Sequence, residues 1–151
     1  MKTIWKKTIT LDAVRQMLNN TLCQRLGMDL TEIGGNFIKG TMPVDSRTVQ
    51  PMGLLHGGAS AAFAESLGSI AGMLACNEDE YCVGVDINVS HLHSVSSGVV
   101  TGAARPLHLG QRIQIWDICI HDGNNRKVCV SRLTLSVLKN RNEVNEWRFK
   151  S

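Results

Sequence analysis

One carboxylate has no charged neighbour in the most apolar stretch of this 151-residue chain. Glu65 follows the run Leu54-Leu55-His56-Gly57-Gly58-Ala59, and no Lys or Arg lies at positions 61–69 to pair with it on a helix. Two consecutive glycines let another group approach the backbone where a helix begins, and the first N–H groups of a helix have no partner inside it. Because they carry the positive end of the helix dipole, these groups could hold an oxyanion while Glu65 acts as a general base or a nucleophile.

Other side chains extend this candidate site. Gln50 and His56 are donors near the same helix terminus and could polarise a carbonyl oxygen, although His56 could instead cap or pack at the helix entry. Ser69 lies one turn after Glu65, on a face of small residues that would leave a groove beside the helix. That face also carries Gly58, Ala61, Ala62, Gly68 and Gly72. Without a catalytic role, Glu65 would be solvated or paired with an arginine elsewhere in the fold.

Histidines further along the chain could contact a ligand. His91 and His93 are two residues apart in or just after an expected strand, so both would face one side. An H-x-H pair can bind a metal, but no third ligand with recognisable spacing follows, so we expect ligand contact and no metal. His108, Gln111 and Arg112 lie where the next strand begins, and their donors and fixed cation could meet phosphate groups. The alternative for these three is a solvated loop.

The hydrophobic pattern predicts a sheet around one helix. We expect a short helix at 11–20 and a long helix at 57–76, which is apolar on nearly all sides and must be covered by other structure. The expected strands are 29–33, 37–44, 81–89, 98–105, 112–121 and 127–138. Turn residues at 34–36 and 122–125, and the short link at 95–98, favour antiparallel neighbours. Since no crossover helix follows residue 80, the prediction is an α+β fold, with a curved antiparallel β-sheet wrapped around one long central α-helix.

Composition indicates the class of protein. We expect one domain at residues 1–138 and a polar tail at 139–151. The net charge of +3 is spread without long runs, which argues against nucleic-acid binding. The first residues lack the apolar core of a signal peptide and no stretch has the length of a membrane span, so we expect no membrane partner. Five cysteines without C-x-x-C spacing indicate reduced thiols and a cytoplasmic protein.

The segment from Met42 to Ser60, followed by Ala64-Glu65-Ser66-Leu67-Gly68-Ser69, resembles the hotdog-fold acyl-CoA thioesterases. A second matching stretch is Pro106-Leu107-His108-Leu109-Gly110, and the resemblance extends from about Ile4 to Leu138. The most similar branch acts on aromatic acyl-CoA esters, including 1,4-dihydroxy-2-naphthoyl-CoA and 4-hydroxybenzoyl-CoA. The resemblance implies a thioester hydrolase that releases free acid and coenzyme A and needs no metal or other cofactor.

The resemblance also implies roles for individual residues. The glutamate matching Glu65 is the nucleophile or general base, Gly57 N–H receives the thioester oxygen, and Ser69 helps to place the attacking water. The residues matching Gln50 and His56 assist. Coenzyme A binds along positions that match Gly84, His91, Leu92, His93, Ser94, His108, Leu109, Gly110, Gln111, Arg112 and Ile113. Close relatives carry arginine at the position of His93, so a permanent cation is replaced here by histidine.

The resemblance also implies a homo-oligomer, either a dimer or a dimer of dimers. The sheets of two subunits would pair, and the site would lie between them. Glu65 would then face residues of the other chain, namely Gln50, His56 and Gly57. One helix cannot bring Glu65 onto its own N-terminus, because eight residues separate Glu65 from Gly57 by about 12 Å. The acyl group is left open, with its pocket lined by candidates Met52, Leu54, Phe63 and Met73. The alternatives are a hydratase or dehydratase of the same fold and a non-catalytic acyl-CoA-binding protein.

Overall fold

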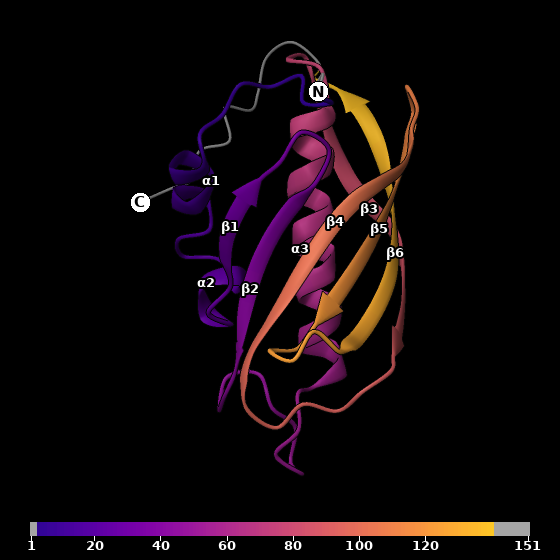
Figure 1. The fold of residues 1–151 in the computed structure, drawn as a ribbon. Helices are drawn as coiled ribbons and strands as arrows, with labels where there is room; N and C mark the ends of the chain where they lie inside the picture. The colour runs from indigo at the N-terminus through magenta and orange to yellow at the C-terminus, as the bar shows by residue number, and fades with distance from the viewer. Residues whose placement is uncertain (1–2, 141–151) are drawn as a thin grey trace.

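A six-stranded sheet curves around one long helix in the computed structural model, which describes residues 3–140 (Figure 1). The long helix is α3 (Gly57–Ala75), and two short helices, α1 (Leu11–Met17) and α2 (Leu22–Arg25), lie on the side of β1. The strands are β1 (Asp29–Ile33), β2 (Ile38–Val44), β3 (Glu80–His91), β4 (Gly98–Leu109), β5 (Ile113–His121) and β6 (Lys127–Lys139). The predicted architecture, an antiparallel sheet wrapped around a long central helix, is confirmed.

The strand order is β1-β2-β4-β5-β6-β3, and every neighbouring pair is antiparallel. The prediction that the link at 95–98 joins neighbouring strands is wrong, because the hairpin of β5 and β6 lies between β3 and β4. The link instead crosses three strand spacings, about 14 Å, past the N-terminal end of α3. Val95 is buried there, and its carbonyl oxygen accepts a hydrogen bond from Leu55 N–H at 2.7 Å. This crossing leaves β3 as an edge strand of the described sheet.

Two predicted boundaries are wrong. The helix expected at 11–20 ends at Met17, because Asn20 adopts a φ of 60° and turns the chain into α2, which the sequence pattern did not predict. The strand expected at 98–105 continues through Pro106 to Leu109. A register shift between Pro106 and His108 lets the strand pass the proline, so His108 and Leu109 belong to β4 and not to a loop.

The core fills the space between α3 and the concave face of the sheet. Phe63 packs against Gly40 of β2 and Gly102 of β4, and a Cβ atom added to Gly102 would crowd its ring. Gly68 and Gly72 likewise make room for leucine side chains of β6, so the expectation that they border a ligand groove is wrong. Small residues on this part of α3 therefore allow close packing of helix on sheet.

Other features of the described residues bear on the class of protein. No helix between residues 3 and 140 has the length and apolarity needed to cross a membrane. All five cysteines are free thiols. β6 includes Lys139, and the N–H of Asn140 donates to the carbonyl oxygen of Asp79 at 2.8 Å. The remainder of the predicted tail, residues 141–151, lies outside the described residues, so the division at residue 138 stays a prediction.

Candidate active site

At the N-terminus of α3, one of the first two backbone N–H groups donates a hydrogen bond and the other has no partner among the described residues. His56 is the N-cap residue, and its Nδ1 accepts a hydrogen bond from Gly58 N–H at 2.7 Å. His56 therefore caps α3, and a neutral ring in this arrangement carries its proton on Nε2, so capping leaves this nitrogen as a further donor. Gly57 N–H makes no hydrogen bond to any described residue. Gly57 N–H is thus the helix-terminal donor that remains available for an oxyanion.

His91 lies next to the Cα atom of Gly57. A Cβ atom added to Gly57 would stand 2.7 Å from His91 Nε2, so the imidazole covers the backbone where α3 begins. The residues are 34 positions apart in the sequence, and β3 brings them together at its C-terminal end. The sequence placed His91 among coenzyme A contacts but gave no signal for this contact with Gly57.

The loop between β2 and α3 lies at the same end of the molecule (Figure 1), and it contains Gln50. Its side-chain oxygen accepts a hydrogen bond from Met52 N–H, and its backbone N–H donates to Leu54 O at 2.8 Å. Nearer the start of the loop, the Arg47 guanidinium bonds Asp45 at 2.6 Å and lowers the pKa of that carboxyl to about 2. These contacts define the course of the loop and leave the amide nitrogen of Gln50 without a described partner.

Glu65 is exposed in a single chain and lies beside β3. An added Cβ atom on Gly84 would stand 3.1 Å from Glu65 Oε1, and the strand has a bulge between Gly84 and Asp86. No ion pair within residues 3–140 includes Glu65, so none of the described arginines is the partner that the alternative interpretation required. Gly84, assigned to coenzyme A by resemblance, therefore also accommodates the candidate catalytic carboxylate.

A cavity of about 670 Å³ opens beside Glu65 and Ser69. Ser66, which lines the same cavity, donates its hydroxyl to Ala62 O at 2.7 Å, whereas the Ser69 hydroxyl has no described partner. Cys82 also lines the cavity, and its hydrogen bond with Cys76 together with burial raises the pKa of its thiol. The raised pKa favours the protonated thiol, so Cys82 is a poor candidate for a nucleophile, and Glu65 stays the candidate that the sequence predicted.

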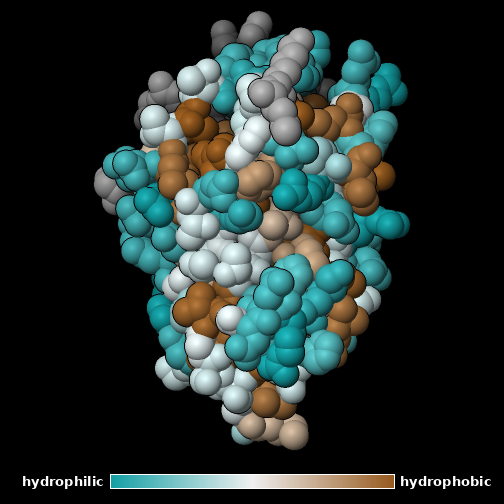
Figure 2. Space-filling view, in the orientation of Figure 1, coloured by the Kyte–Doolittle hydropathy of each residue, from teal (hydrophilic) through white to brown (hydrophobic). Residues whose placement is uncertain are grey.

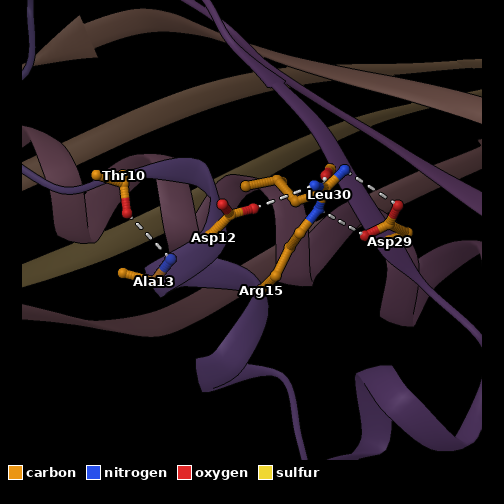
Figure 3. Close-up of polar contacts among 6 residues, drawn as sticks. All are labelled: Thr10, Asp12, Ala13, Arg15, Asp29 and Leu30. Carbon is orange, nitrogen blue, oxygen red and sulfur yellow. Dashed lines mark hydrogen bonds and ion pairs between the residues drawn. The ribbon is translucent and has the colours of Figure 1, made fainter.

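The two short helices form the opposite wall of this cavity, and Arg15 fixes α1 in place (Figure 3). Arg15 Nε donates to Leu30 O at 2.9 Å and to Asp29 Oδ1 at 3.1 Å, which ties α1 to β1. Thr10 caps the helix by accepting from Ala13 N–H at 3.2 Å. The α1 part of this wall is therefore attached to the sheet.

One chain does not bring the predicted coenzyme A contacts together. These contacts form two groups, which lie beside different parts of β6. His91 of the first group pairs with Cys129 and Ile113 of the second pairs with Ser136, so the two groups are seven residues, about 23 Å, apart along β6. The first group is His91, Leu92, His93 and Ser94, and the second is His108, Leu109, Gly110, Gln111, Arg112 and Ile113. Gly84 lies level with the second group, because it pairs with Leu135.

Local contacts hold each group. His93 Nδ1 lies 2.9 Å from Lys127 O, and the turn between β4 and β5 is closed by a hydrogen bond from Gly110 N–H to Ile113 O at 2.9 Å. The Arg112 side chain is exposed, while its carbonyl oxygen accepts from Val137 N–H at 2.8 Å. Nowhere in residues 3–140 do three or more His, Cys, Asp or Glu side chains gather in an arrangement that could hold a metal ion.

Comparison with known proteins gives this arrangement its family. The sequence profile of the thioesterase superfamily matches residues 52–129. The proofreading thioesterase EntH of Cronobacter turicensis is 48% identical over 135 residues, which cover 89% of this chain and 98% of that protein. The 1,4-dihydroxy-2-naphthoyl-CoA hydrolase of Escherichia coli K12 is 47% identical over 135 residues, with 89% and 99% covered.

A solved structure of a thioesterase is also similar to this chain. The crystal structure of a thioesterase from Haemophilus influenzae superimposes with a TM-score of 0.91 at 47% identity and covers 94% of this chain and 100% of that one. The matched profile spans α3 with Glu65 and the whole of β3, β4 and β5, and its arrangement of sheet and helix is the hotdog fold. The chain therefore belongs to the thioesterase superfamily, as its resemblance predicted, and is a thioester hydrolase.

Proposed function

We propose that this protein hydrolyses an aromatic acyl-CoA thioester to the free acid and coenzyme A, with 1,4-dihydroxy-2-naphthoyl-CoA as the first candidate substrate. The observation that carries the proposal is the carboxylate of Glu65, which lines a cavity and forms no ion pair within residues 3–140, together with a Gly57 N–H that has no partner among the same residues. The named substrate of the Escherichia coli relative supports the choice of acyl group. The five free thiols are in keeping with a cytoplasmic location, which is part of the proposal.

The chemistry follows from the donors and acceptors already described. As a general base, Glu65 takes a proton from water while the water oxygen bonds to the thioester carbon. As a nucleophile, its carboxylate oxygen bonds to that carbon and gives an anhydride, which water then hydrolyses. In both routes the carbonyl oxygen becomes an oxyanion held by Gly57 N–H, and the carbon–sulfur bond breaks to release the coenzyme A thiolate.

Three side chains have supporting roles in this proposal. His56 Nε2–H and the amide nitrogen of Gln50 are donors at the oxyanion end, and the hydroxyl of Ser69 orients the attacking water next to Glu65. Trapping an acyl anhydride on Glu65 in a single turnover would select the nucleophilic route, and its absence together with a solvent isotope effect would select the general-base route.

A dimer formed through β3 would complete the site. β3 is an edge strand of 12 residues, and Val83, Val85 and Leu92 on or just after it are exposed apolar side chains. In Figure 2, brown hydrophobic residues interrupt the hydrophilic surface along the side on which β3, β6 and the end of β4 lie in Figure 1. A long unpaired apolar edge is a template for strand addition, and a second copy of the same edge satisfies it in a two-fold dimer.

The positions of Gly84 and His91 specify how such a dimer would be aligned. Gly84 lies next to the carboxylate of Glu65, and the His91 ring lies next to Gly57. Antiparallel pairing of two β3 strands about an axis near Ile87 and Asn88 would set Gly84 of one chain opposite His91 of its partner. Glu65 would then approach Gly57 across the interface, and both groups of coenzyme A contacts would lie at one level of the joined sheet. A dimer of dimers is a further prediction on which nothing described here depends.

Substitution of Glu65 tests the proposal. Glu65→Gln keeps the shape of the side chain and Glu65→Ala removes it, and both should lower kcat for thiol release by about 10²-fold or more with an unchanged circular dichroism spectrum. Turnover at the wild-type rate in either variant would contradict the assignment. A hydratase or dehydratase would add or remove water without releasing thiol, and a non-catalytic binding protein would show saturable binding without turnover.

A further inference from the structure

The cavity beside Glu65 continues along α3 well beyond the candidate catalytic residues. Glu65, Ser69 and Met73 line it at successive turns, and Tyr81 lines it after the chain has turned into β3. Eight residues of helix separate Glu65 from Met73 by about 12 Å. Along β3, Tyr81 lies three residues, about 10 Å, from Gly84, which marks the position of Glu65. The cavity is therefore long enough for an acyl group that extends from Glu65 towards Tyr81.

Most of the cavity wall is apolar. Met17, Leu18 and Leu22 of the short-helix region form one side, and Ile70 and Met73 of α3 form another. Phe63, a candidate for this pocket in the sequence, is buried in the core on the sheet side of α3, so that prediction is wrong. Both an aromatic and an aliphatic acyl group would be shielded from water between these walls. The apolar walls alone therefore do not select one kind of acyl group over the other.

The polar groups at the far end of the cavity indicate which kind of acyl group would fit it. Lys7 Nζ donates to Glu80 O at 2.7 Å, and the Glu80 carboxylate accepts from Asn77 N–H at 3.0 Å, so each of these groups already has one partner. Glu78 and Asn140, which also line the cavity, are exposed to solvent. The hydroxyl of Tyr81, a partly buried residue and the one tyrosine of the chain, has no hydrogen-bond partner among the described residues.

We infer that Tyr81 determines substrate specificity by hydrogen bonding a hydroxyl group at the end of the acyl group remote from the thioester. The inference rests on the proposed function and narrows its substrate class to hydroxyaryl acyl groups. A hydroxylated ring satisfies both the apolar walls and the Tyr81 hydroxyl. A plain alkyl chain or an unsubstituted ring fills the same walls but excludes water from the hydroxyl and leaves it unpaired, which disfavours those substrates.

Tyr81→Phe tests this inference, because it removes the hydroxyl and keeps the ring. The quantity to measure is the ratio of kcat/KM for 4-hydroxybenzoyl-CoA to kcat/KM for benzoyl-CoA. We expect the wild-type ratio to exceed one and to fall about tenfold in Tyr81→Phe. The matched control is Ser66→Ala, which removes a hydroxyl from the same cavity that is already bonded to Ala62 O; it should keep the wild-type ratio.

The outcomes separate this inference from the proposed function. If both esters are hydrolysed and Tyr81→Phe retains the wild-type ratio, the inference is overturned while the thioesterase assignment stands. A wild-type preference for octanoyl-CoA over 4-hydroxybenzoyl-CoA would also overturn the inference. If no coenzyme A ester releases thiol, the proposed function itself fails. Thermal unfolding of Tyr81→Phe at the wild-type temperature would show that a changed ratio does not come from a damaged fold.

Discussion

Glu65 Oε1 lies so close to Gly84 that a Cβ atom on this glycine would stand 3.1 Å from the carboxylate oxygen. The contact joins the middle of α3 to a bulged position of the edge strand, at the point where β3 passes the cavity. Gly84 therefore has a structural reason to be glycine that is separate from coenzyme A binding. The carboxylate can occupy this position only while no side chain is present on the strand.

We expect Gly84→Ala to lower activity while the fold is kept. The added methyl group is tighter against Glu65 Oε1 than an ordinary contact, so the flexible carboxylate must move by a few tenths of an ångström. Misplacement of a catalytic group on this scale should reduce kcat by about tenfold or more. Gly123→Ala is the matched control, because an added Cβ there meets no atom within 4 Å. Equal kcat values in the two variants would show that the Gly84 contact does not position Glu65.

Mixing two inactive variants tests whether the site is shared between subunits. Glu65→Ala and Gln50→Ala should each lose activity, but a mixed dimer of the two would contain one site with both native residues. Random pairing makes half of the dimers mixed, so about one quarter of the wild-type sites should return after subunit exchange. Activity and dimer composition can be followed together by kinetic assay and native mass spectrometry. If exchange is complete and no activity returns, the site lies within a single chain.

Much of the fold was predictable because its signals are local. β2 alternates buried and half-buried residues along its length, and α3 carries an apolar sequence that no exposed helix would have. Strand order was not predictable in the same way. The length of the link after β3 allows pairing with β4, and only the competing hairpin of β5 and β6 excludes it. The helix α2, with four residues, is too short to produce a periodic pattern.

The residues of the candidate site also differ in whether local sequence signals could identify them. Glu65, Gly57 and His56 were identified because their neighbours in sequence make them unusual. The contacts of Glu65 with Gly84 and of Gly57 with His91 join residues 19 and 34 positions apart, and they depend on the bulge and the strand order. Tyr81 was missed because nothing in its sequence neighbourhood marks the end of a cavity.

Two substitutions of His56 should separate its capping role from a chemical role. His56→Ala removes the acceptor for Gly58 N–H and should lower the free energy of unfolding by about 1 kcal/mol. His56→Asn supplies a favoured N-cap oxygen and should restore most of that stability. If the imidazole also donates to the thioester, activity will stay low in both variants. Activity that recovers in His56→Asn together with stability, as measured by urea unfolding and thiol release, would assign His56 to capping alone.

The pair of Asp45 and Arg47 should make the loop before α3 sensitive to acid. The hydrogen bonds from Arg47 lower the pKa of Asp45 from 3.8 to about 2, so the folded state favours the ionised carboxyl. The stabilisation is therefore complete above pH 3.8 and is lost as the pH falls through about 2. Arg47→Ala should return the pKa of Asp45 towards 3.8, measured by NMR titration of its carboxyl carbon, and should lower Tm more at pH 6 than at pH 2. Arg25→Ala is the control, because Arg25 forms no ion pair within the described residues. An Asp45 titration that is identical in wild type and Arg47→Ala would show that the pair does not form in solution.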